Sequence, residues 1–144
     1  MDVISTILAA AKAVGVNGTL LLAICSHESN DFKVNYVAQD RGSPSYGSCQ
    51  LKVGTAALFG FKGNPNQLNE LKTNAKYAAL YLRRHQEHYG EDWIKLTAAY
   101  NAGSFFPSKK NPRCPKNMGY VKLVQKKLPL ELQRILDCDK NGEN

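Results

Sequence analysis

Apolar residues recur every three or four positions along most of this chain, which is the spacing of one face of an α-helix. The first stripe stops before Gly15 and the Asn17-Gly18 pair, and it consists of Ile4, Ile7, Leu8, Ala11 and Val14. The second begins near Thr19 and consists of Leu21, Ile24, Cys25 and Glu28. Two helices are therefore predicted at the start of the chain, and the second carries a carboxyl group on its apolar face.

Helical spacing is lost over residues 30–50. Val34, Tyr36 and Val37 are strand formers, and residues 40–47 are rich in turn formers. A small β-hairpin or an irregular lobe is predicted here. A short helix is expected over residues 53–59, and a loop is expected over residues 60–65.

The longest helical pattern runs from about Asn66 to Tyr89, and its core face consists of Leu68, Leu71, Ala75, Ala78 and Leu82. After Gly90 a further stripe starts at Trp93 and ends at residues 101–103. Residues 103–117 contain three prolines and four basic residues, so a loop is predicted there. Two short helices follow, one around residues 120–124 and one from Pro129 onward, and residues 139–144 are expected to form a flexible tail.

These elements predict a mainly helical α+β fold, in which a helical bundle carries a small hairpin lobe. A length of 144 residues with 43% hydrophobic residues suits one domain over residues 1–144. The formal charge of +7 favours polyanionic surroundings, such as nucleic acid or a bacterial envelope. Because the basic residues are spread along the chain and not gathered into one recognition helix, nucleic-acid binding is not expected.

The start of the chain favours an amphipathic helix over a signal peptide, because Met1-Asp2-Val3-Ile4 has no positive charge and Lys12 interrupts the apolar stretch. No membrane span is expected. With synthesis in the cytosol, the four cysteines are expected to be thiols rather than bridges or zinc ligands, since no C-x-x-C spacing links Cys25, Cys49, Cys114 and Cys138. No metal or cofactor is predicted.

Glu28 is the candidate catalytic residue. Desolvation at an apolar helix edge disfavours an ionised carboxylate, so the pKa of Glu28 is expected to rise, and the group then carries a proton near neutral pH. The alternative is a glutamate that caps or solvates the end of a helix. Motifs later in the chain favour the acid.

Four short motifs occur in a fixed order: Glu28-Ser29 at a helix end, the segment 47–51 with sequence GSCQL, the segment 99–103 with sequence AYNAG, and Tyr120-Val121-Lys122. Over roughly Leu20 to Lys127 this order resembles the catalytic domain of the soluble lytic transglycosylases, a family of the lysozyme superfamily that cleaves peptidoglycan. The resemblance implies a lysozyme-like fold with a substrate cleft. The chain departs from the family pattern at Ser48-Cys49, where Leu-Met is usual, and this puts the shape of a sugar subsite in doubt.

The resemblance also implies a chemistry without water, metal or cofactor. Glu28 would protonate the oxygen of the MurNAc-GlcNAc β-1,4 bond and then, as a carboxylate, accept the proton of the muramyl 6-hydroxyl while that hydroxyl attacks the anomeric carbon. The product would carry a 1,6-anhydroMurNAc end. Substrate-positioning roles are implied for Ser29, Gln50, Tyr100, Asn101 and Tyr120. A bridge between Cys25 and Cys49 is expected only if the protein reaches an oxidising compartment.

Two other functions stay open. A goose-type lysozyme would use Glu28 to activate water together with a second carboxylate roughly 6.5–9.5 Å away, and Asp40 is the best candidate for it, followed by Asp31. A non-catalytic wall-binding module would use its aromatic residues and positive charge alone. For the individual residues, Ser29 is also explained by a helix end, Gln50 and Asn101 by turns, and Tyr100 by the core.

The expected setting is a bacteriophage endolysin that acts as a monomer on peptidoglycan. Such an enzyme would be made in the host cytoplasm and reach the periplasm and cell wall with the help of a holin-like protein, without inserting into the membrane. A virion-associated enzyme that pierces the wall is the other setting considered.

Overall fold

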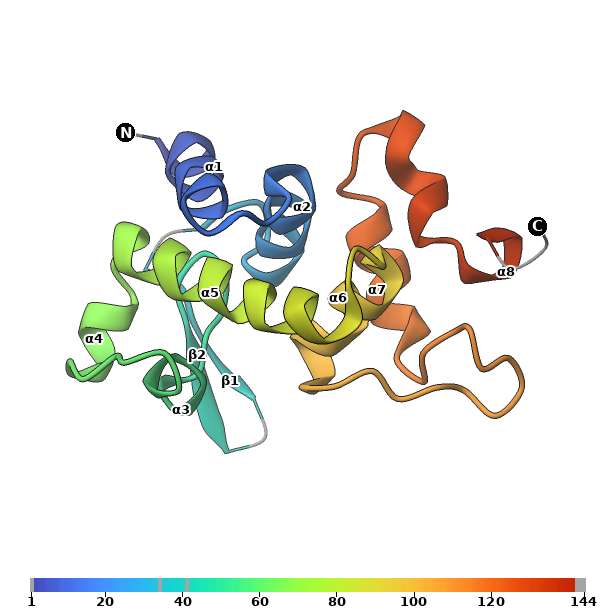
Figure 1. Cartoon of the computed structure of the whole chain (residues 1–144). Coiled ribbons are helices and arrows are strands. Elements are labelled where there is room, and N and C mark those ends of the chain that lie inside the picture. Colours follow the sequence, from blue (N-terminus) through green and yellow to red (C-terminus); the bar gives the residue numbers. More distant parts are fainter. Residues whose placement is uncertain (1, 34, 41, 142–144) are drawn as a thin grey trace. The chain divides into compact units, whose positions relative to one another are not determined.

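The computed structural model describes residues 2–33, 35–40 and 42–141, and this part of the chain contains eight α-helices, one 3-10 helix and a two-stranded sheet (Figure 1). A mainly helical fold with a small hairpin is thus confirmed. The chain divides into two compact units, residues 1–83 and 84–144, which are described separately below. The assignment of residues 1–144 to one domain stays a prediction. Among the described residues, no helix combines the length and the apolar character needed to cross a membrane.

The first unit begins with the two predicted helices. Helix α1 (Val3–Val14) starts at Asp2, whose side chain accepts a hydrogen bond from the Ser5 amide, and it ends at Gly15, whose φ of 77° favours glycine. Helix α2 (Gly18–Glu28) starts at Asn17, whose side chain accepts from the Leu20 amide. The two helices pack together, and their apolar stripes supply the buried residues Ile7, Ala11, Leu20, Leu21 and Ile24.

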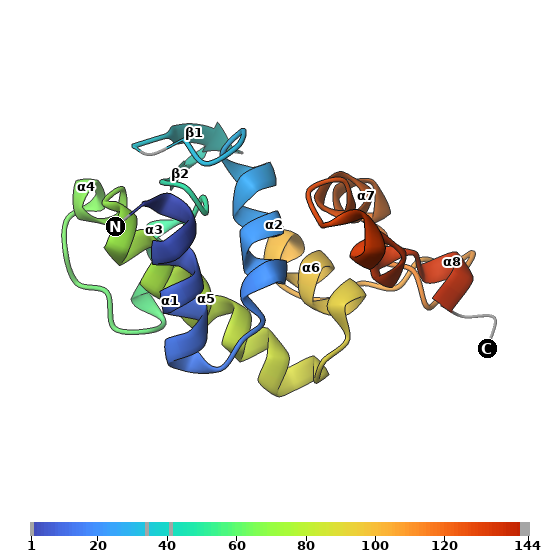
Figure 2. The same ribbon diagram turned by 90° about the horizontal axis from the view of Figure 1, so that it is seen from above.

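A hairpin follows α2, as predicted. Strand β1 (Val37–Asp40) pairs antiparallel with β2 (Ser43–Tyr46) in a register that sets Val37 opposite Tyr46. Figure 1 and Figure 2 both show the hairpin beyond the C-terminal end of α2. Of the predicted strand formers, Val34 lies outside the described residues.

The pattern predicted as one helix over residues 66–89 is two helices, so that prediction was wrong. Helix α3 (Val53–Ala57) is followed by α4 (Pro65–Leu68) and then by α5 (Leu71–Tyr89). A capping box of Asn64 and Gln67, with proline at the first helical position, starts α4. At the break after Leu68, the Asn74 side chain donates to the Leu68 carbonyl at 2.9 Å and so satisfies the last carbonyl of α4.

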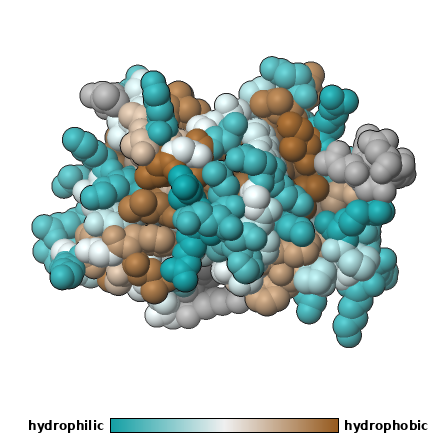
Figure 3. Space-filling model, viewed as in Figure 1, coloured by the Kyte–Doolittle hydropathy of each residue, from teal (hydrophilic) through white to brown (hydrophobic). Residues whose placement is uncertain are grey.

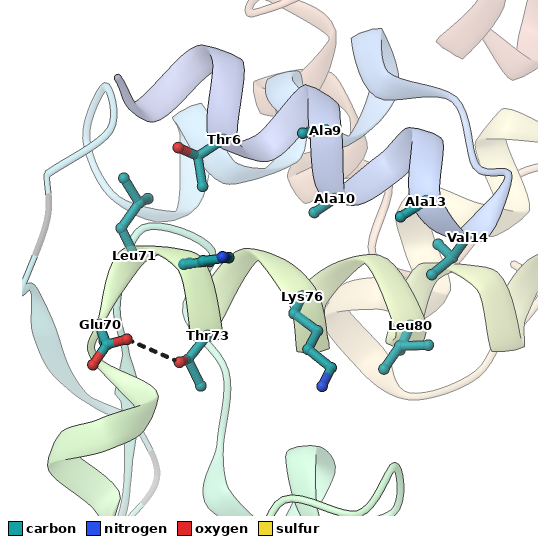
Figure 4. A pocket seen from close by; sticks show the side chains of 11 residues that line it. Thr6, Ala9, Ala10, Ala13, Val14, Glu70, Leu71, Thr73, Lys76 and Leu80 are labelled. Carbon is teal, nitrogen blue, oxygen red and sulfur yellow. Dashed lines mark hydrogen bonds between the residues drawn. The ribbon is translucent and has the colours of Figure 1, made fainter. Parts of the chain in front are cut away.

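Helices α1 and α5 flank a groove of about 780 Å³ in the first unit (Figure 4). Ala10 and Ala13 of α1 point toward α5, and Leu80 of α5 is a further lining residue. Glu70 and Thr73 are polar lining residues and form a hydrogen bond of 3.3 Å. The small side chains of α1 thus leave the two helices incompletely packed.

The second unit contains the end of α5, α6 (Trp93–Ala102), α7 (Met118–Gln125), the 3-10 helix η1 (Leu130–Leu136) and α8 (Cys138–Asn141). Helix α6 starts at Asp92, whose side chain accepts from the Lys95 amide, and ends at Gly103 with a φ of 88°. The predicted last helix is therefore a 3-10 helix. The prediction of a flexible tail was wrong for residues 139–141, which belong to α8, and residues 142–144 lie outside the described residues. Apolar side chains reach the surface over η1 (Figure 3), where Leu130 is 81% exposed.

The predicted loop between α6 and α7 is tied down at several points. The Phe105 amide donates to the Tyr89 hydroxyl at 2.8 Å, and the two rings meet edge to face. Pro107 and Pro115 form an isolated antiparallel bridge across the loop. This loop is therefore ordered against the end of α5, although its composition predicted only irregular structure.

All four cysteines are bonded, so the expectation of thiols was wrong. Cys25 is joined to Cys49, the pair expected in an oxidising compartment, and Cys114 is joined to Cys138. Each pair is separated by 24 positions in the sequence. Short spacing rules do not detect such pairs, because the fold brings the two sulfur atoms together.

Loss of either bridge is expected to destabilise the protein by about 3 kcal/mol, because a closed loop of this length restricts the unfolded chain. Chemical denaturation of Cys25→Ser/Cys49→Ser and of Cys114→Ser/Cys138→Ser measures the loss. The two double variants are matched controls for each other, since the loops have equal length. Unchanged unfolding free energies would show that the bridges do not form.

His85, which is 6% exposed, should make the stability depend on pH. Burial, followed by the positive charges of Arg84 and His88, lowers its pKa from 6.5 to about 4. Between these values the unfolded state binds the proton and the folded state does not, so stability falls as pH falls from about 6.5 to about 4, by up to about 3 kcal/mol. His85→Gln should lose less stability over this range than the wild type in urea unfolding. His88→Gln, an exposed control on the same helix, should keep most of the wild-type slope.

Candidate active site

Glu28 is the last residue of α2 and its side chain is half-buried. The residue after it, Ser29, is fully buried, and both its amide and its hydroxyl donate to the Cys25 carbonyl, at 3.0 and 2.9 Å. These bonds satisfy a carbonyl that the helix end would otherwise leave open. Ser29 thus caps the end of the helix, which agrees with the alternative explanation by a helix end, and its role toward a substrate stays a prediction.

The chain turns sharply after Glu28. Asn30, Asp31 and Phe32 all have positive φ values, of 50°, 65° and 69°, a conformation that costs energy for residues other than glycine. Two hydrogen bonds fix the turn: the Asp31 amide donates to the Ser26 carbonyl at 2.8 Å, and the Ser26 hydroxyl donates to the Asp31 carboxylate at 2.9 Å. The strained turn therefore fixes the direction in which the chain leaves α2.

Gln50 lies in a tight loop, residues 47–51, that follows β2. Its backbone φ is 51°, and its side-chain amide nitrogen donates to the carbonyls of Tyr36 and Gly47, both at 2.9 Å. Both amide hydrogens are thereby used to fix the side chain, and the amide oxygen is its remaining polar atom. Gln50 is half-buried, so this oxygen is the atom suited to contact a sugar or a carboxyl group.

Residues 48 and 49, at which the chain departs from the family pattern, lie in the interior of the protein. Ser48 is 1% exposed and its hydroxyl donates to the Lys33 carbonyl at 3.1 Å, while Cys49 is fully buried in its bond to Cys25. Both residues thus lie in the interior, where the Cys25–Cys49 bond joins the loop to α2. The effect of this departure on the shape of a sugar subsite stays a prediction.

Tyr81 lies on α5 in a second helical stripe, with Tyr77, His85 and His88, for which the sequence favours packing against neighbouring helices over contact with a ligand. Burial, and after it the negative charge of Glu28, raises the pKa of Tyr81 above its usual value of 10. The phenol therefore stays neutral at physiological pH, near enough to Glu28 to feel its charge. Its ring packs edge to face on Phe59, at 6.5 Å between centroids. Helical spacing indicated packing for this face of α5, and spacing alone cannot show that a packed tyrosine also faces a carboxyl group.

The second unit groups the other predicted site residues. Tyr100 is 6% exposed in α6, and Asn101 follows it on the surface. The Asn117 side chain donates to the Asn101 side-chain oxygen at 2.9 Å and to the Ala98 carbonyl at 3.1 Å. Asn117 also precedes α7, which carries the half-exposed Tyr120 in its first turn. Asn117 thus connects the AYNAG motif to Tyr120, a role that its place in a predicted loop did not reveal.

The predicted site residues form two groups: Glu28, Ser29 and Gln50 in the first unit, and Tyr100, Asn101 and Tyr120 in the second. Their catalytic and binding roles stay predictions. For the hydrolase alternative, Asp40 ends strand β1, but its side chain lies outside the described part of the structure.

A model of the transglycosylase SLT domain matches residues 5–117. The chain belongs to this family. The predicted recognition of a lytic transglycosylase domain is therefore confirmed, and with it the class of enzyme. No curated protein matched the sequence.

A solved structure shows the same fold. The inactive mutant of the lytic transglycosylase Slt from Pseudomonas aeruginosa, in which a glutamate is replaced by glutamine, superposes with a TM-score of 0.59 at 21% identity. The match covers 93% of this chain and 22% of the Slt chain, so the SLT chain described here corresponds to about a fifth of that protein. The lysozyme-like fold expected from the sequence is thus confirmed.

Proposed function

We propose that this SLT domain cleaves the MurNAc-GlcNAc β-1,4 bond of peptidoglycan and leaves 1,6-anhydroMurNAc ends. The observation that carries the proposal is the position of Glu28 in a chain of this family: it ends a buried helix, beside a strained turn, and one helical turn after Cys25, which is bonded to the residue before Gln50. That Slt is inactive as a glutamate-to-glutamine mutant supports a glutamate as the essential group.

The proposed reaction needs one carboxyl group in two states. Protonated Glu28 gives its proton to the glycosidic oxygen as the bond from that oxygen to the anomeric carbon breaks, and the leaving sugar receives it as a hydroxyl. Ionised Glu28 then takes the proton of the muramyl 6-hydroxyl while that oxygen bonds to the anomeric carbon. The proton returns to Glu28, so the enzyme is regenerated and no water is consumed.

The remaining site residues have supporting roles in this reaction. The neutral phenol of Tyr81 near Glu28 offers a hydroxyl to the carboxylate without a fixed positive charge. Gln50 presents its amide oxygen from a fixed loop. Tyr100, Asn101 and Tyr120 are proposed to bind the glycan, with Asn117 holding Asn101 in place.

Product analysis tests the proposal. Mass spectrometry of digested peptidoglycan should show muropeptides with anhydro ends, lighter by one water than reducing muramic acid. Glu28→Gln should lower the rate of their formation by a factor of about 10² to 10⁴, because the amide neither donates nor accepts the transferred proton. Circular dichroism should show an unchanged fold.

Asp40→Asn separates the proposal from the goose-type alternative. A transglycosylase needs no second carboxylate, so this variant should keep forming anhydro products at close to the wild-type rate. Reducing muramic acid as the product, together with loss of activity in Asp40→Asn, would establish the hydrolase. Undiminished clearing of peptidoglycan by Glu28→Gln would establish that Glu28 is not the acid.

The setting that we propose is wall lysis by a bacteriophage, as an endolysin or a virion-associated enzyme. Two disulfides suit action in an oxidising compartment such as the periplasm, and the charge of +7 favours an anionic cell envelope. Production in the bacterial cytoplasm should leave cells intact until a holin-like protein permeabilises the inner membrane, after which turbidity should fall. Lysis without permeabilisation would contradict the endolysin setting, and a protein found in purified virions would favour the other.

A further inference from the structure

A buried amide on α5 holds the loop that carries Gln50. Asn74 is fully buried, and its side-chain nitrogen donates to the carbonyls of Tyr46 and Leu68, at 2.6 and 2.9 Å. Its side-chain oxygen accepts from the Cys49 amide at 2.8 Å. Both hydrogens and the oxygen of the amide are thus used inside the protein, and two of the three bonds go to the backbone of Tyr46, just before the loop, and of Cys49, within it.

Gly47 has no side chain, and this leaves the space that the Asn74 amide occupies. A methyl group added to Gly47 would lie 2.4 Å from the Asn74 side-chain nitrogen, which is closer than atoms can approach, and Gly47 has a φ of 80°. The glycine that opens the GSCQL motif is therefore explained by the close approach of Asn74 as well as by its own turn. The loop backbone and the Asn74 side-chain amide are therefore packed directly against each other.

The loop is also connected to the candidate acid. Cys49, whose amide Asn74 binds, is bonded to Cys25, which lies three residues before Glu28 in the last turn of α2. Gln50 follows Cys49 directly. Without the Asn74 side chain, the Cys49 amide and the Leu68 carbonyl would lose this partner in the interior, and the Tyr46 carbonyl would keep only its bond from the Leu51 amide. A loop with a positive φ at Gln50 would then relax toward other conformations.

We propose that Asn74 is a positioning residue of the transglycosylase reaction, which fixes the loop 47–51 and through it the amide of Gln50 and the end of α2 that carries Glu28. This inference rests on the proposed function. Asn74 contacts no substrate in it, and its effect passes through Gln50 and the Cys25–Cys49 bond.

Asn74→Ala and Asn74→Asp test the inference through kcat and KM on soluble glycan strands. Each should lower kcat at least about tenfold at temperatures where the variant is folded, because small displacements of catalytic groups are costly. Asn74→Asp keeps the acceptor for the Cys49 amide but loses both donors. Its activity relative to the wild type should rise as pH falls, because a protonated aspartic acid regains one donor.

A double-mutant cycle with Gln50→Ala distinguishes positioning from a general loss of structure. If Asn74 acts through the loop, Asn74→Ala should reduce kcat less than about twofold when Gln50 is already alanine. Leu136→Ala, a truncation of a fully buried side chain in the second unit, is the matched control for destabilisation and should leave kcat of the folded protein within about twofold of the wild type. Unchanged kcat in folded Asn74→Ala, or effects of Asn74 and Gln50 that multiply independently, would overturn the inference. So would unfolding of both Asn74 variants under conditions in which Leu136→Ala folds.

Hydrogen exchange provides a readout that does not depend on the reaction. The amide of Cys49 should exchange faster in Asn74→Ala than in the wild type or Leu136→Ala, because its acceptor is gone. Full activity of Glu28→Gln would refute the proposed function, and with it the positioning role, even if this exchange accelerates. Normal Glu28 behaviour with slow exchange at Cys49 in Asn74→Ala would refute the positioning role alone.

Discussion

The covalent bond between Cys25 and Cys49 is the constraint around which the first unit is arranged. A helix end is the part of a helix that frays most readily, since its last carbonyls have no partners in the helix. Here the disulfide joins the last turn of α2 to a loop that comes after the hairpin. The Ser29 hydroxyl in addition donates to the Cys25 carbonyl. A catalytic carboxyl group at the end of a helix needs such a restraint, because its position has to be the same in every molecule.

The same loop combines two demands that usually conflict. Gln50 has to be half-exposed to meet a substrate, whereas its neighbours Ser48 and Cys49 are buried and hold the loop in the interior. Positive φ values at Gly47 and Gln50 let buried and half-exposed side chains follow one another within the five residues of the loop. The hydrogen bonds of Asn74 offset the backbone strain of these φ values. In this chain, the Ser48 hydroxyl and the Cys25–Cys49 disulfide anchor the loop.

The helices were predictable because their apolar spacing records which face is buried, and α1, α2 and α6 begin and end close to the predicted residues. Prediction failed where a distant partner decides the structure. At the break between α4 and α5, the Leu68 carbonyl is satisfied by Asn74, an amide that looks like any polar residue in a helical pattern. The disulfides depend on partners 24 positions apart. Of the candidate site, motif order predicted Glu28 and Gln50, and helical spacing assigned Tyr81 to packing. Neither pattern indicated Asn74 or Asn117, whose side chains bind motif residues from outside the motifs.

The surroundings of Glu28 suit a group that must alternate between two charge states. A cation beside the carboxylate would stabilise its ionised form and weaken it as an acid, whereas a wholly apolar site would keep it protonated and weaken it as a base. Glu28 is half-buried, and its negative charge is the second cause, after burial, that raises the pKa of the Tyr81 phenol. In the proposed reaction the proton lost in the first step returns in the second. The proposed site therefore has to favour neither state strongly, and it contains a phenol, Tyr81, whose pKa is raised by burial and then by the charge of Glu28.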